Sequence, residues 1–369
     1  MNSEERVWAV LNREEVDRVP IHIITVDGKI CDEVLGKPPR TTFDTIDELE
    51  KQYPEDWIER VNGILTNIEI SLFTNSIETA AELGFDSVGA GYIPFTIKGK
   101  EEMTDIFGRK YKIVNSHGHI MPYYIEGLIK NKEDWNNYPK PDLKNIFSEA
   151  KKLFKTIIRR KKKISNPNLS ILAQDDYVSV FPPAWQAMGM ETFARNLKKD
   201  PDLIREILKY STDIVIGLFK TYSELGAKIF FEASDLAYRS GPLVNPKFVR
   251  EFVQPCMKRV TEAVHDLGGK VIFHSDGDIT LLLDFIVDSG FDAVHCLEPP
   301  YVDLELLKKK YGDKLCFLGN IDTSHVLVSG TKEEVEGAVK YAIKTLGKGG
   351  GLIISPTNTH PAMNLQQIK

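Results

Sequence analysis

The chain has 369 residues, of which 42% are hydrophobic and 27% are charged. This length and composition provide enough apolar surface for a large packed core or two smaller ones, and they exclude a disordered chain. The formal net charge of −6 argues against nucleic acid as the main partner, so small molecules or proteins are the expected partners.

The N-terminal residues and the cysteines indicate a soluble protein of the cytoplasm. Met1 is followed by the polar sequence NSEER, and no apolar run reaches the roughly 18 residues that a membrane span needs. The four cysteines are scattered, which favours free thiols in a reducing compartment. We therefore expect a cytoplasmic location without a membrane-spanning segment.

Short apolar runs that end in polar or small residues recur along the chain. Amphipathic stretches separate most of them, and Gly226 and Gly268 precede two of the runs, where a helix C-cap is expected. Continuously apolar strands that alternate with helices are typical of a parallel sheet covered on both faces. The eight expected strands are 19–25, 85–91, 169–176, 227–235, 269–278, 291–300, 313–322 and 350–358.

Eight such units predict a closed (β/α)₈ TIM barrel. An open doubly wound sheet is the alternative, but no GxGxxG follows any of the runs. Residues 92–168 contain DIFGRKYKIV and HGHIMPYYIEG, which predict a hairpin or small subdomain inserted after the second strand. We therefore expect residues 1–369 to form a single barrel domain with an insertion at about 92–168. The basic run 159–163 is interpreted as the solvated end of an amphipathic helix.

Polar residues follow the strands, where a barrel of this kind carries its functional side chains. They are rich in carboxylates and poor in arginine and lysine, which suits a metal ion or proton transfer better than an anionic substrate. These candidates are Asp27, Gln174, Asp175, Asp176, Glu232, Asp235, His274, Asp276, Glu298, Asn320, Asp322, Asn358 and His360.

The sequence VIFHSDGDI carries the clearest metal-ligand pattern. His274 and Asp276 are two residues apart, so they share a face of a strand, and imidazole with carboxylate is a common zinc pair. A hydrogen-bonded pair at a strand end is the alternative, with Asp278 as a helix N-cap. His360 and Asp322 have structural alternatives as well, as a surface residue and a turn residue.

Several separated sequence blocks resemble the uroporphyrinogen decarboxylase superfamily. They occur in the same order as in that superfamily and cover nearly the whole chain. The blocks are RVWAVLNREEVDRVPI, DLAYRSGPLVNPKFVREFVQP, VIFHSDGDI, GFDAVHCLEPPYVDLELLKKKYGDKLCFLGNID and GTKEEVEGAVKYAI. The resemblance implies a (β/α)₈ barrel with one of two chemistries. One branch decarboxylates an acidic tetrapyrrole without a cofactor, and the other transfers methyl groups with zinc and a separate corrinoid protein.

The chain departs from both branches at informative positions. The decarboxylases have an arginine-rich segment after the first strand, whereas this chain has IHIITVDGK, which would leave substrate carboxylates without a clamp. The methyltransferases have a His-x-Cys and a further cysteine after the last strand. Here His274 matches the histidine, Asp276 takes the first cysteine position, and Asn358 or His360 lies near the second. None of the four cysteines replaces them by position.

The hypothesis is a corrinoid-dependent methyltransferase that demethylates a small methylated compound of the methoxy type. A zinc ion bound by histidine and aspartate is a harder Lewis acid than one bound by two thiolates, so it is better suited to polarising a substrate oxygen. The expected metal ligands are His274 and Asp276 with a third from Glu232 or His360. Asp235 or Asp322 would orient the substrate or supply a proton. Substrate binding is assigned to Asp27, Gln174, Tyr238 and Asn320.

Two other readings compete with methyl transfer. A cofactor-free decarboxylase of a carboxylated substrate would use Asp27 and Tyr238 at the barrel mouth. A protein that binds a corrinoid or tetrapyrrole without turnover is less consistent with the carboxylate-rich mouth, because unpaired buried carboxylates are costly. The resemblance also suggests a homodimer.

Overall fold

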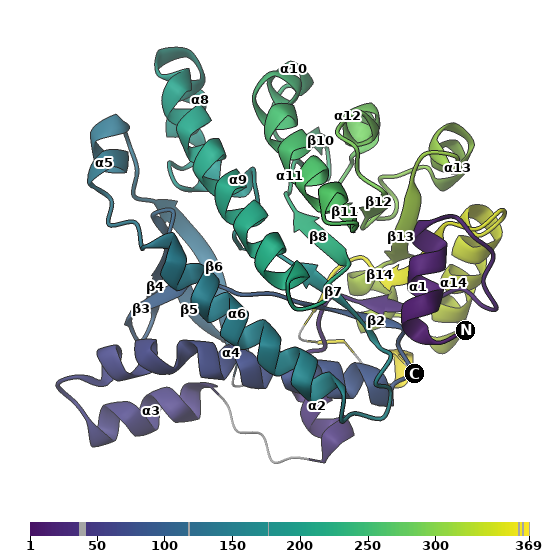
Figure 1. Cartoon of the computed structure of the whole chain (residues 1–369), viewed down its shortest axis with the longest axis horizontal. Coiled ribbons are helices and arrows are strands. Elements are labelled where there is room, and N and C mark those ends of the chain that lie inside the picture. The colour runs from purple at the N-terminus through teal and green to yellow at the C-terminus, as the bar shows by residue number, and fades with distance from the viewer. Residues whose placement is uncertain (37–41, 117–118, 176, 361, 364, 369) are drawn as a thin grey trace.

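Eight parallel strands form the central sheet of the computed structural model, which describes residues 1–36, 42–116, 119–175, 177–360, 362–363 and 365–368 (Figure 1). Their order is also their order along the chain. Ile21 bridges to Ile354 beside the first and last strands, and the Ile354 amide donates to the Pro20 carbonyl at 2.9 Å. The sheet therefore nearly closes into a barrel. The strands are β1 (His22–Ile23), β2 (Ser87–Ala90), β7 (Ser170–Gln174), β8 (Ile229–Ala233), β11 (Lys270–His274), β12 (Ala293–His295), β13 (Cys316–Ile321) and β14 (Leu352–Pro356).

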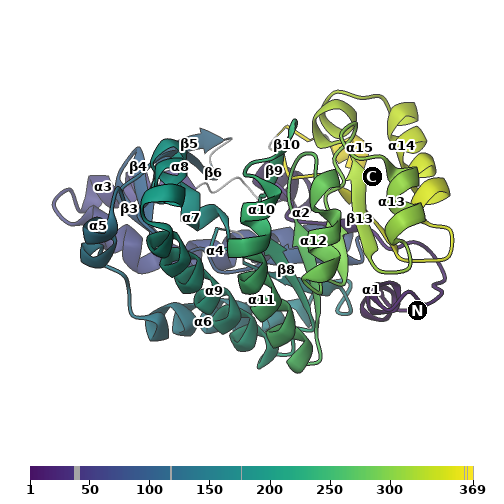
Figure 2. The same ribbon diagram turned by 90° about the horizontal axis from the view of Figure 1, so that it is seen from above.

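Helices connect these strands and surround the barrel, as the two views show (Figures 1 and 2). Gly226 and Gly268 follow α9 and α11 with φ of 98° and 70°, so the two expected C-caps are confirmed. The predicted TIM barrel is confirmed as well. The helices are α1 (Ser3–Leu11), α2 (Gly28–Leu35), α3 (Thr42–Gln52), α4 (Trp57–Glu82), α5 (Lys132–Asn137), α6 (Leu143–Lys161), α7 (Pro182–Gln186), α8 (Met190–Lys199), α9 (Pro201–Ser223), α10 (Pro246–Phe248), η1 (Val249–Val253), α11 (Gln254–Asp266), η2 (Thr280–Leu282), α12 (Leu283–Asp288), α13 (Leu304–Tyr311), η3 (Thr323–Val328), α14 (Lys332–Leu346) and α15 (Leu365–Ile368).

Alternation along the strands divides the core into two layers. On β8, Ile229 and Phe231 join the cluster inside the barrel, while Phe230 joins the larger cluster between the sheet and the helices. Apolar residues of α1 pack into the inner cluster, so this helix covers the N-terminal end of the barrel. The opposite end, at the C-termini of the strands, is the end that stays available for ligands.

A second sheet follows β2, as expected for the insertion. It is antiparallel and has four strands, so it is larger than a hairpin; its strands are β3 (Phe95–Gly99), β4 (Glu102–Asp105), β5 (Arg109–Ser116) and β6 (His119–Gly127). It packs beside α3 and α4 at one side of the barrel (Figure 1). A two-stranded hairpin, β9 (Ala237–Tyr238) and β10 (Gly241–Pro242), follows β8. The description of residues 1–369 as one domain stays a prediction.

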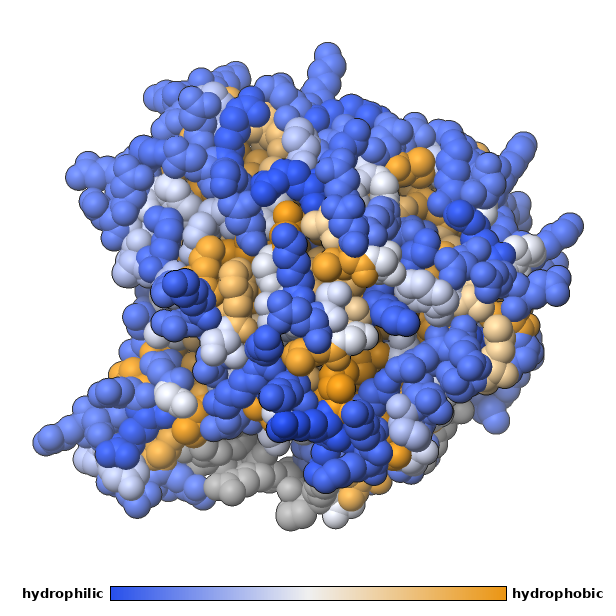
Figure 3. Space-filling model, viewed as in Figure 1, coloured by the Kyte–Doolittle hydropathy of each residue, from blue (hydrophilic) through white to orange (hydrophobic). Residues whose placement is uncertain are grey.

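The outer surface carries many ion pairs, such as Arg205 with Glu251 and Arg259 with Asp213. The face in Figure 3 is largely hydrophilic, with apolar residues in separated groups. The basic run lies at the C-terminal turn of α6, where Arg160 pairs with Glu78 and Lys161 contacts Glu4, which confirms the interpretation as a helix end. No helix in the described part of the chain is both long and apolar enough to span a membrane.

Candidate functional site

Two buried histidines face each other at the C-terminal ends of β11 and β12. His274 pairs with His295 in the parallel register, and their Nδ1 atoms lie 2.7 Å apart. His295 Nε2 lies 3.1 Å from the Pro356 carbonyl, which can only accept, so Nε2 carries the proton. Burial lowers the pKa of His295 well below its usual value, so the ring is neutral and its Nδ1 accepts a hydrogen bond from His274 Nδ1–H. His274 Nε2 is therefore left with a free lone pair.

Two carboxylates lie next to this lone pair. Asp235 Oδ1 and Asp276 Oδ1 are each 3.7 Å from His274 Nε2. The Asp276 amide donates to Asp235 Oδ1 at 3.1 Å, and the Asn358 amide group lies 3.2 Å from both Asp276 oxygens. Burial raises the pKa of Asp276 above its usual value. The arrangement gathers one nitrogen and two oxygen donors from the ends of β8 and β11, with Asn358 orienting one carboxylate.

A cysteine from the next strand also reaches this group, although it does not stand at either of the family's two cysteine positions. Cys296 Sγ lies 3.6 Å from Asp276 Oδ1, and burial raises the pKa of its thiol well above the usual value. Glu298 follows on the same segment and accepts a hydrogen bond from the Gly277 amide at 2.9 Å. Among the described residues, three overlapping sets place their ligand atoms within 4.8 Å of one another: Asp235/His274/Asp276, His274/His295/Cys296 and Asp276/Cys296/Glu298.

The register of β11 and β12 explains why Cys296 reaches this group. His274 and His295 are register partners on neighbouring parallel strands, so the residues that follow them leave the barrel at the same height. The residue after His295 therefore lies close to the HSD segment. A search restricted to the family's cysteine positions misses it, because the thiol comes from a different strand.

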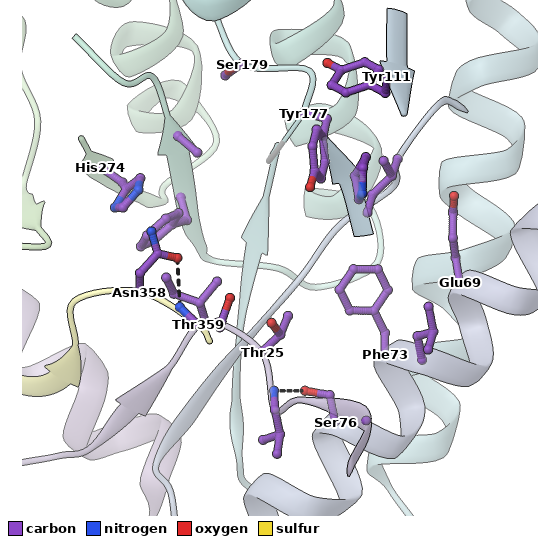
Figure 4. Close-up of a pocket in the computed structure, with 18 of the residues that line it drawn as sticks. Thr25, Glu69, Phe73, Ser76, Tyr111, Tyr177, Ser179, His274, Asn358 and Thr359 are labelled. Atoms are coloured by element: carbon purple, nitrogen blue, oxygen red, sulfur yellow. Dashed lines mark hydrogen bonds between the residues drawn. The ribbon is translucent and has the colours of Figure 1, made fainter. Parts of the chain in front are cut away.

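The cluster of possible metal ligands, here called the donor group, opens onto a cavity of about 540 Å³ at the barrel mouth. The donor group consists of Asp235, His274, Asp276, Cys296 and Glu298. His274 and Asn358 lie on one side of this cavity and Glu69 and Phe73 of α4 on the other (Figure 4). The antiparallel sheet supplies a further wall through Tyr111 and other residues of β5 and β6. The insertion is therefore part of the ligand pocket.

Arg109 is the one arginine or lysine among the described residues that line the cavity, and it is occupied by other groups. Its guanidinium contacts Asp105 and the Tyr177 carbonyl, and its Nη1 donates to Gln186 Oε1 at 2.7 Å. All of these contacts are internal to the protein. The pocket therefore lacks the exposed cationic clamp that a polyanionic substrate needs.

Glu232 is not brought to the donor group, contrary to its expected role as a ligand. It follows Phe231 on β8, so it points away from the barrel interior toward the surrounding helices. Its Oε1 accepts hydrogen bonds from the Val180 amide at 3.0 Å and from the Ser234 hydroxyl. Burial raises the pKa of Glu232 to about 7.

Three more expected site residues cap local structure instead. Asp322 caps η3 by accepting from the His325 amide at 2.8 Å, and Asp27 caps α2 by accepting from the Lys29 amide at 2.9 Å. His360 is exposed, and its Nδ1 accepts from the Ala362 amide at 3.0 Å. The expected catalytic role of Asp322 and the expected metal role of His360 therefore lack a place in this site. The sequence alternatives of a turn residue and a surface residue describe them correctly.

The remaining expected substrate contacts lie outside the lining of the cavity. Gln174 is buried against Gly89, where an added Cβ would lie 2.0 Å from its Oε1. Tyr238 is 56% exposed on the β9–β10 hairpin, and Asn320 is buried at the end of β13. Asp176 lies outside the described residues. Of the expected residues, the structure gathers Asp235, His274, Asp276, Glu298 and Asn358.

Curated relatives of the chain are methyltransferases of Methanosarcina species. A methylated-thiol–coenzyme M methyltransferase of Methanosarcina mazei is 29% identical over 163 residues, 44% of this chain and 42% of that protein. The methylcobamide:CoM methyltransferase MtaA of Methanosarcina barkeri is 25% identical over 49% of this chain and 51% of that protein. The match thus spans about half the length of these two relatives. The methylcobamide:CoM methyltransferase MtbA of M. mazei is 24% identical over 99% of this chain and 96% of its own length.

A solved structure and a family model match the chain as well. A methyltransferase from M. mazei superposes with a TM-score of 0.73 at 17% identity, covering 100% of this chain and 96% of that one, which shows a shared fold. The model described as uroporphyrinogen decarboxylase (URO-D) matches residues 102–369, well over half of the sequence. The chain therefore belongs to the uroporphyrinogen decarboxylase family.

Proposed function

We propose that this protein is a corrinoid-dependent methyltransferase that takes a methyl group from a small methylated donor, of the methoxy type, and transfers it to the cobalt of a separate corrinoid protein. The observation that carries the proposal is the donor group around His274 Nε2, with Asp235 and Asp276 each 3.7 Å away, at the edge of a 540 Å³ cavity. The names of the relatives support methyl transfer with a corrinoid.

The residues present fit a zinc ion. The His295 contact leaves His274 Nε2 with an unprotonated lone pair, which is the form that binds a metal. Asp276, Asp235 and Cys296 add two carboxylates and a thiol, and nitrogen, oxygen and sulfur are the usual zinc ligands. His274 and Asp276 would hold the ion, with Cys296 as the further ligand, which leaves the neighbouring Asp235 free to handle a proton. When bound, zinc supplies Lewis acidity that draws electron density from a donor oxygen.

The protein side chains would position the methyl donor and supply a proton to the leaving oxygen. The methyl carbon–oxygen bond breaks with its electron pair left on oxygen, and the electron pair of reduced cobalt forms the new cobalt–carbon bond. The leaving oxygen needs a proton, and Asp235 lines the cavity with a half-exposed side chain that can exchange protons with solvent. Asp235 rather than Asp322 is assigned this role, because Asp322 is engaged with His325 away from the cavity lining.

A decarboxylase of a polycarboxylate is less consistent with this cavity. Arg109 is committed to Asp105, Gln186 and Tyr177, so it is not available for substrate carboxylates. The donor group at the edge of the same cavity is rich in carboxylates and would repel an anionic substrate.

A second candidate is the transfer of a methyl group from a corrinoid to a thiol. It is favoured by Cys296, whose thiolate would make the ion softer and better suited to a sulfur substrate, and by the coenzyme M in the relatives' names. Two assays separate the two reactions. One contains a methoxy compound with cobalt(I) corrinoid protein, and the other contains a free thiol with methylated corrinoid.

Metal content and methyl transfer together test the proposal. We expect about one zinc per chain in the wild type, a large loss in His274→Ala, and no loss in the control His265→Ala, whose ring contacts Asp292 on the surface. We also expect the wild type to convert cobalt(I) corrinoid to methylcobalt(III) with a methoxy donor, followed by absorbance. A wild-type protein that binds no stoichiometric metal contradicts the proposed mechanism.

A further inference from the structure

The cavity contains a second polar end, formed by Glu69. This residue lies on α4 and is 9% exposed, and it lines the cavity on the side opposite His274 (Figure 4). Its Oε2 has no hydrogen-bond partner among the described residues, and no ion pair to it is found in that part of the chain. The proposed chemistry at His274 does not use it. Glu69 is therefore a buried carboxyl group that faces the ligand space with an unused oxygen.

The surroundings of Glu69 do not favour a charged group. Leu72 and Phe73 line the same part of the cavity and Glu149 is a nearby like charge, whereas the Ile93 backbone amide gives the carboxyl one hydrogen bond. Burial raises the pKa of Glu69 well above its usual value, which favours the carboxylic acid over the carboxylate. A carboxylic acid has one O–H donor and retains acceptor capacity. It can thus exchange two hydrogen bonds with a neutral partner.

No described residue of the cavity forms a hydrogen bond with Glu69 Oε2. Arg109, the one cationic guanidinium in the lining, is engaged by Asp105 and Gln186. A buried polar atom without a partner costs free energy, so a protein gains stability if an apolar residue of similar size replaces it. A hydrogen bond from a bound ligand to Glu69 Oε2 would offset this free-energy cost.

The shape and chemistry of that ligand follow from the walls. Phe73, Tyr111 and Tyr177 line the space near Glu69 and provide aromatic surface for a ring (Figure 4). We propose that Glu69 is a specificity-determining residue that binds a hydroxyl group of the methyl donor, at the end of the molecule remote from the methyl group. This inference rests on the proposed function, and it narrows the donor to neutral methoxy compounds that carry a hydroxyl group, such as methoxyphenols.

A binding comparison tests the assignment. Three probes share a methoxybenzene unit: 3-methoxyphenol carries a hydroxyl group, methoxybenzene carries none, and 3-methoxybenzylammonium carries a cation. Calorimetry on the wild-type protein with its metal should give about tenfold tighter binding of 3-methoxyphenol than of methoxybenzene, the usual effect of one buried neutral hydrogen bond. Glu69→Leu should bring the two affinities to within about twofold, and Glu69→Gln, whose amide still pairs with a hydroxyl, should keep most of the difference.

Thermal unfolding adds a readout that separates recognition from structure. Glu69→Leu should unfold at a higher temperature than the wild type, because the uncompensated carboxyl is removed. Glu82→Leu, an exposed position on the same helix, is the matched control and should change neither the selectivity nor the metal content. A structural role for Glu69 would instead lower the melting temperature of Glu69→Leu.

Each outcome decides for or against the inference. Equal wild-type affinities for 3-methoxyphenol and methoxybenzene, or binding of neither, overturn it. Preference for the ammonium probe that is lost in Glu69→Gln also overturns it, because the site would then be anionic. Metal content is measured on the same samples. Equal affinities with full metal content contradict the Glu69 assignment alone, whereas absence of metal contradicts the proposed function.

Discussion

His274 Nδ1 and His295 Nδ1 lie 2.7 Å apart inside the barrel, and the His295 ring is fixed in turn on the Pro356 carbonyl. The hydrogen bond sets which nitrogen carries the proton in the neutral His274 ring, so the unprotonated nitrogen of that tautomer is the cavity-facing Nε2. His295 is thus a positioning residue for the proposed metal site.

Removal of this contact should weaken metal binding. We expect His295→Leu to reduce zinc affinity by about 10- to 100-fold, the usual effect of losing a hydrogen-bond partner of a metal-bound histidine. His295→Gln, which can still accept from His274, should lose less. Competition with a chromogenic chelator measures both, with His265→Gln as the surface control. Unchanged affinity in His295→Leu would contradict the role.

Cys296 should become a thiolate when a metal binds. Its pKa is raised by burial, so the metal-free protein carries a thiol and metal binding should release a proton. Addition of cobalt(II) to metal-free protein should produce a thiolate-to-cobalt charge-transfer band in the near ultraviolet, and Cys296→Ser should abolish it. Cys316→Ser is the control, because Cys316 Sγ contacts the Val10 carbonyl near the covered end of the barrel. A band that persists in Cys296→Ser would exclude this cysteine.

Glu232 should make stability depend on pH. Burial raises its folded-state pKa from 4.5 to about 7, so its contribution to stability is fully present below pH 4.5 and is lost as the pH rises through 7. The loss is on the order of 3 kcal/mol. Glu232→Gln, which keeps an acceptor for the Val180 amide, should be more stable than the wild type at pH 8 and lack this pH dependence. Urea unfolding at several pH values measures it, and parallel pH profiles of the two proteins would refute it.

Gly277 should be required at the barrel mouth. It has a φ of 80°, and an added Cβ would lie 2.3 Å from the Tyr238 backbone. Gly277→Ala should therefore cost about 2 kcal/mol or more, through strain and a shift of the β9–β10 hairpin. Gly268→Ala is the control: its φ is 70°, but the space around it is open, so a cost of about 1 kcal/mol is expected. Equal melting temperatures for the two variants would argue against the steric effect.

The barrel could be predicted from the sequence because its strands are buried on both faces. A run such as AKIFFEASD is apolar at consecutive positions, and that pattern differs from the surrounding amphipathic helices. All eight expected runs contain a strand of the barrel. The antiparallel sheet was less visible, since its strands alternate polar and apolar residues, and its packing against α3 and α4 is set by tertiary contacts.

The site was predicted in part, for a geometric reason. His274 and Asp276 are on one segment, so their proximity is a local property of the chain. Glu232 is one residue after Phe231, and the strand alternation that points Phe231 inward points Glu232 outward, which the position at a strand end did not reveal. Cys296 and Glu69 depend on contacts between segments far apart in sequence, so only the folded structure identifies them.

The antiparallel sheet that follows β2 has a consequence for how donor preference can change. The proposed metal donors come from the ends of β8, β11 and β12, whereas β5 and β6 contribute Tyr111 and Tyr124 to the opposite wall. Substitutions on β5 and β6 can therefore reshape the space for a donor while the atoms that hold the ion keep their positions. Under the proposed function, the residues for the chemistry and for substrate choice would lie in separate stretches of the chain, and exchange of residues 95–127 between relatives would be a direct route to new donors.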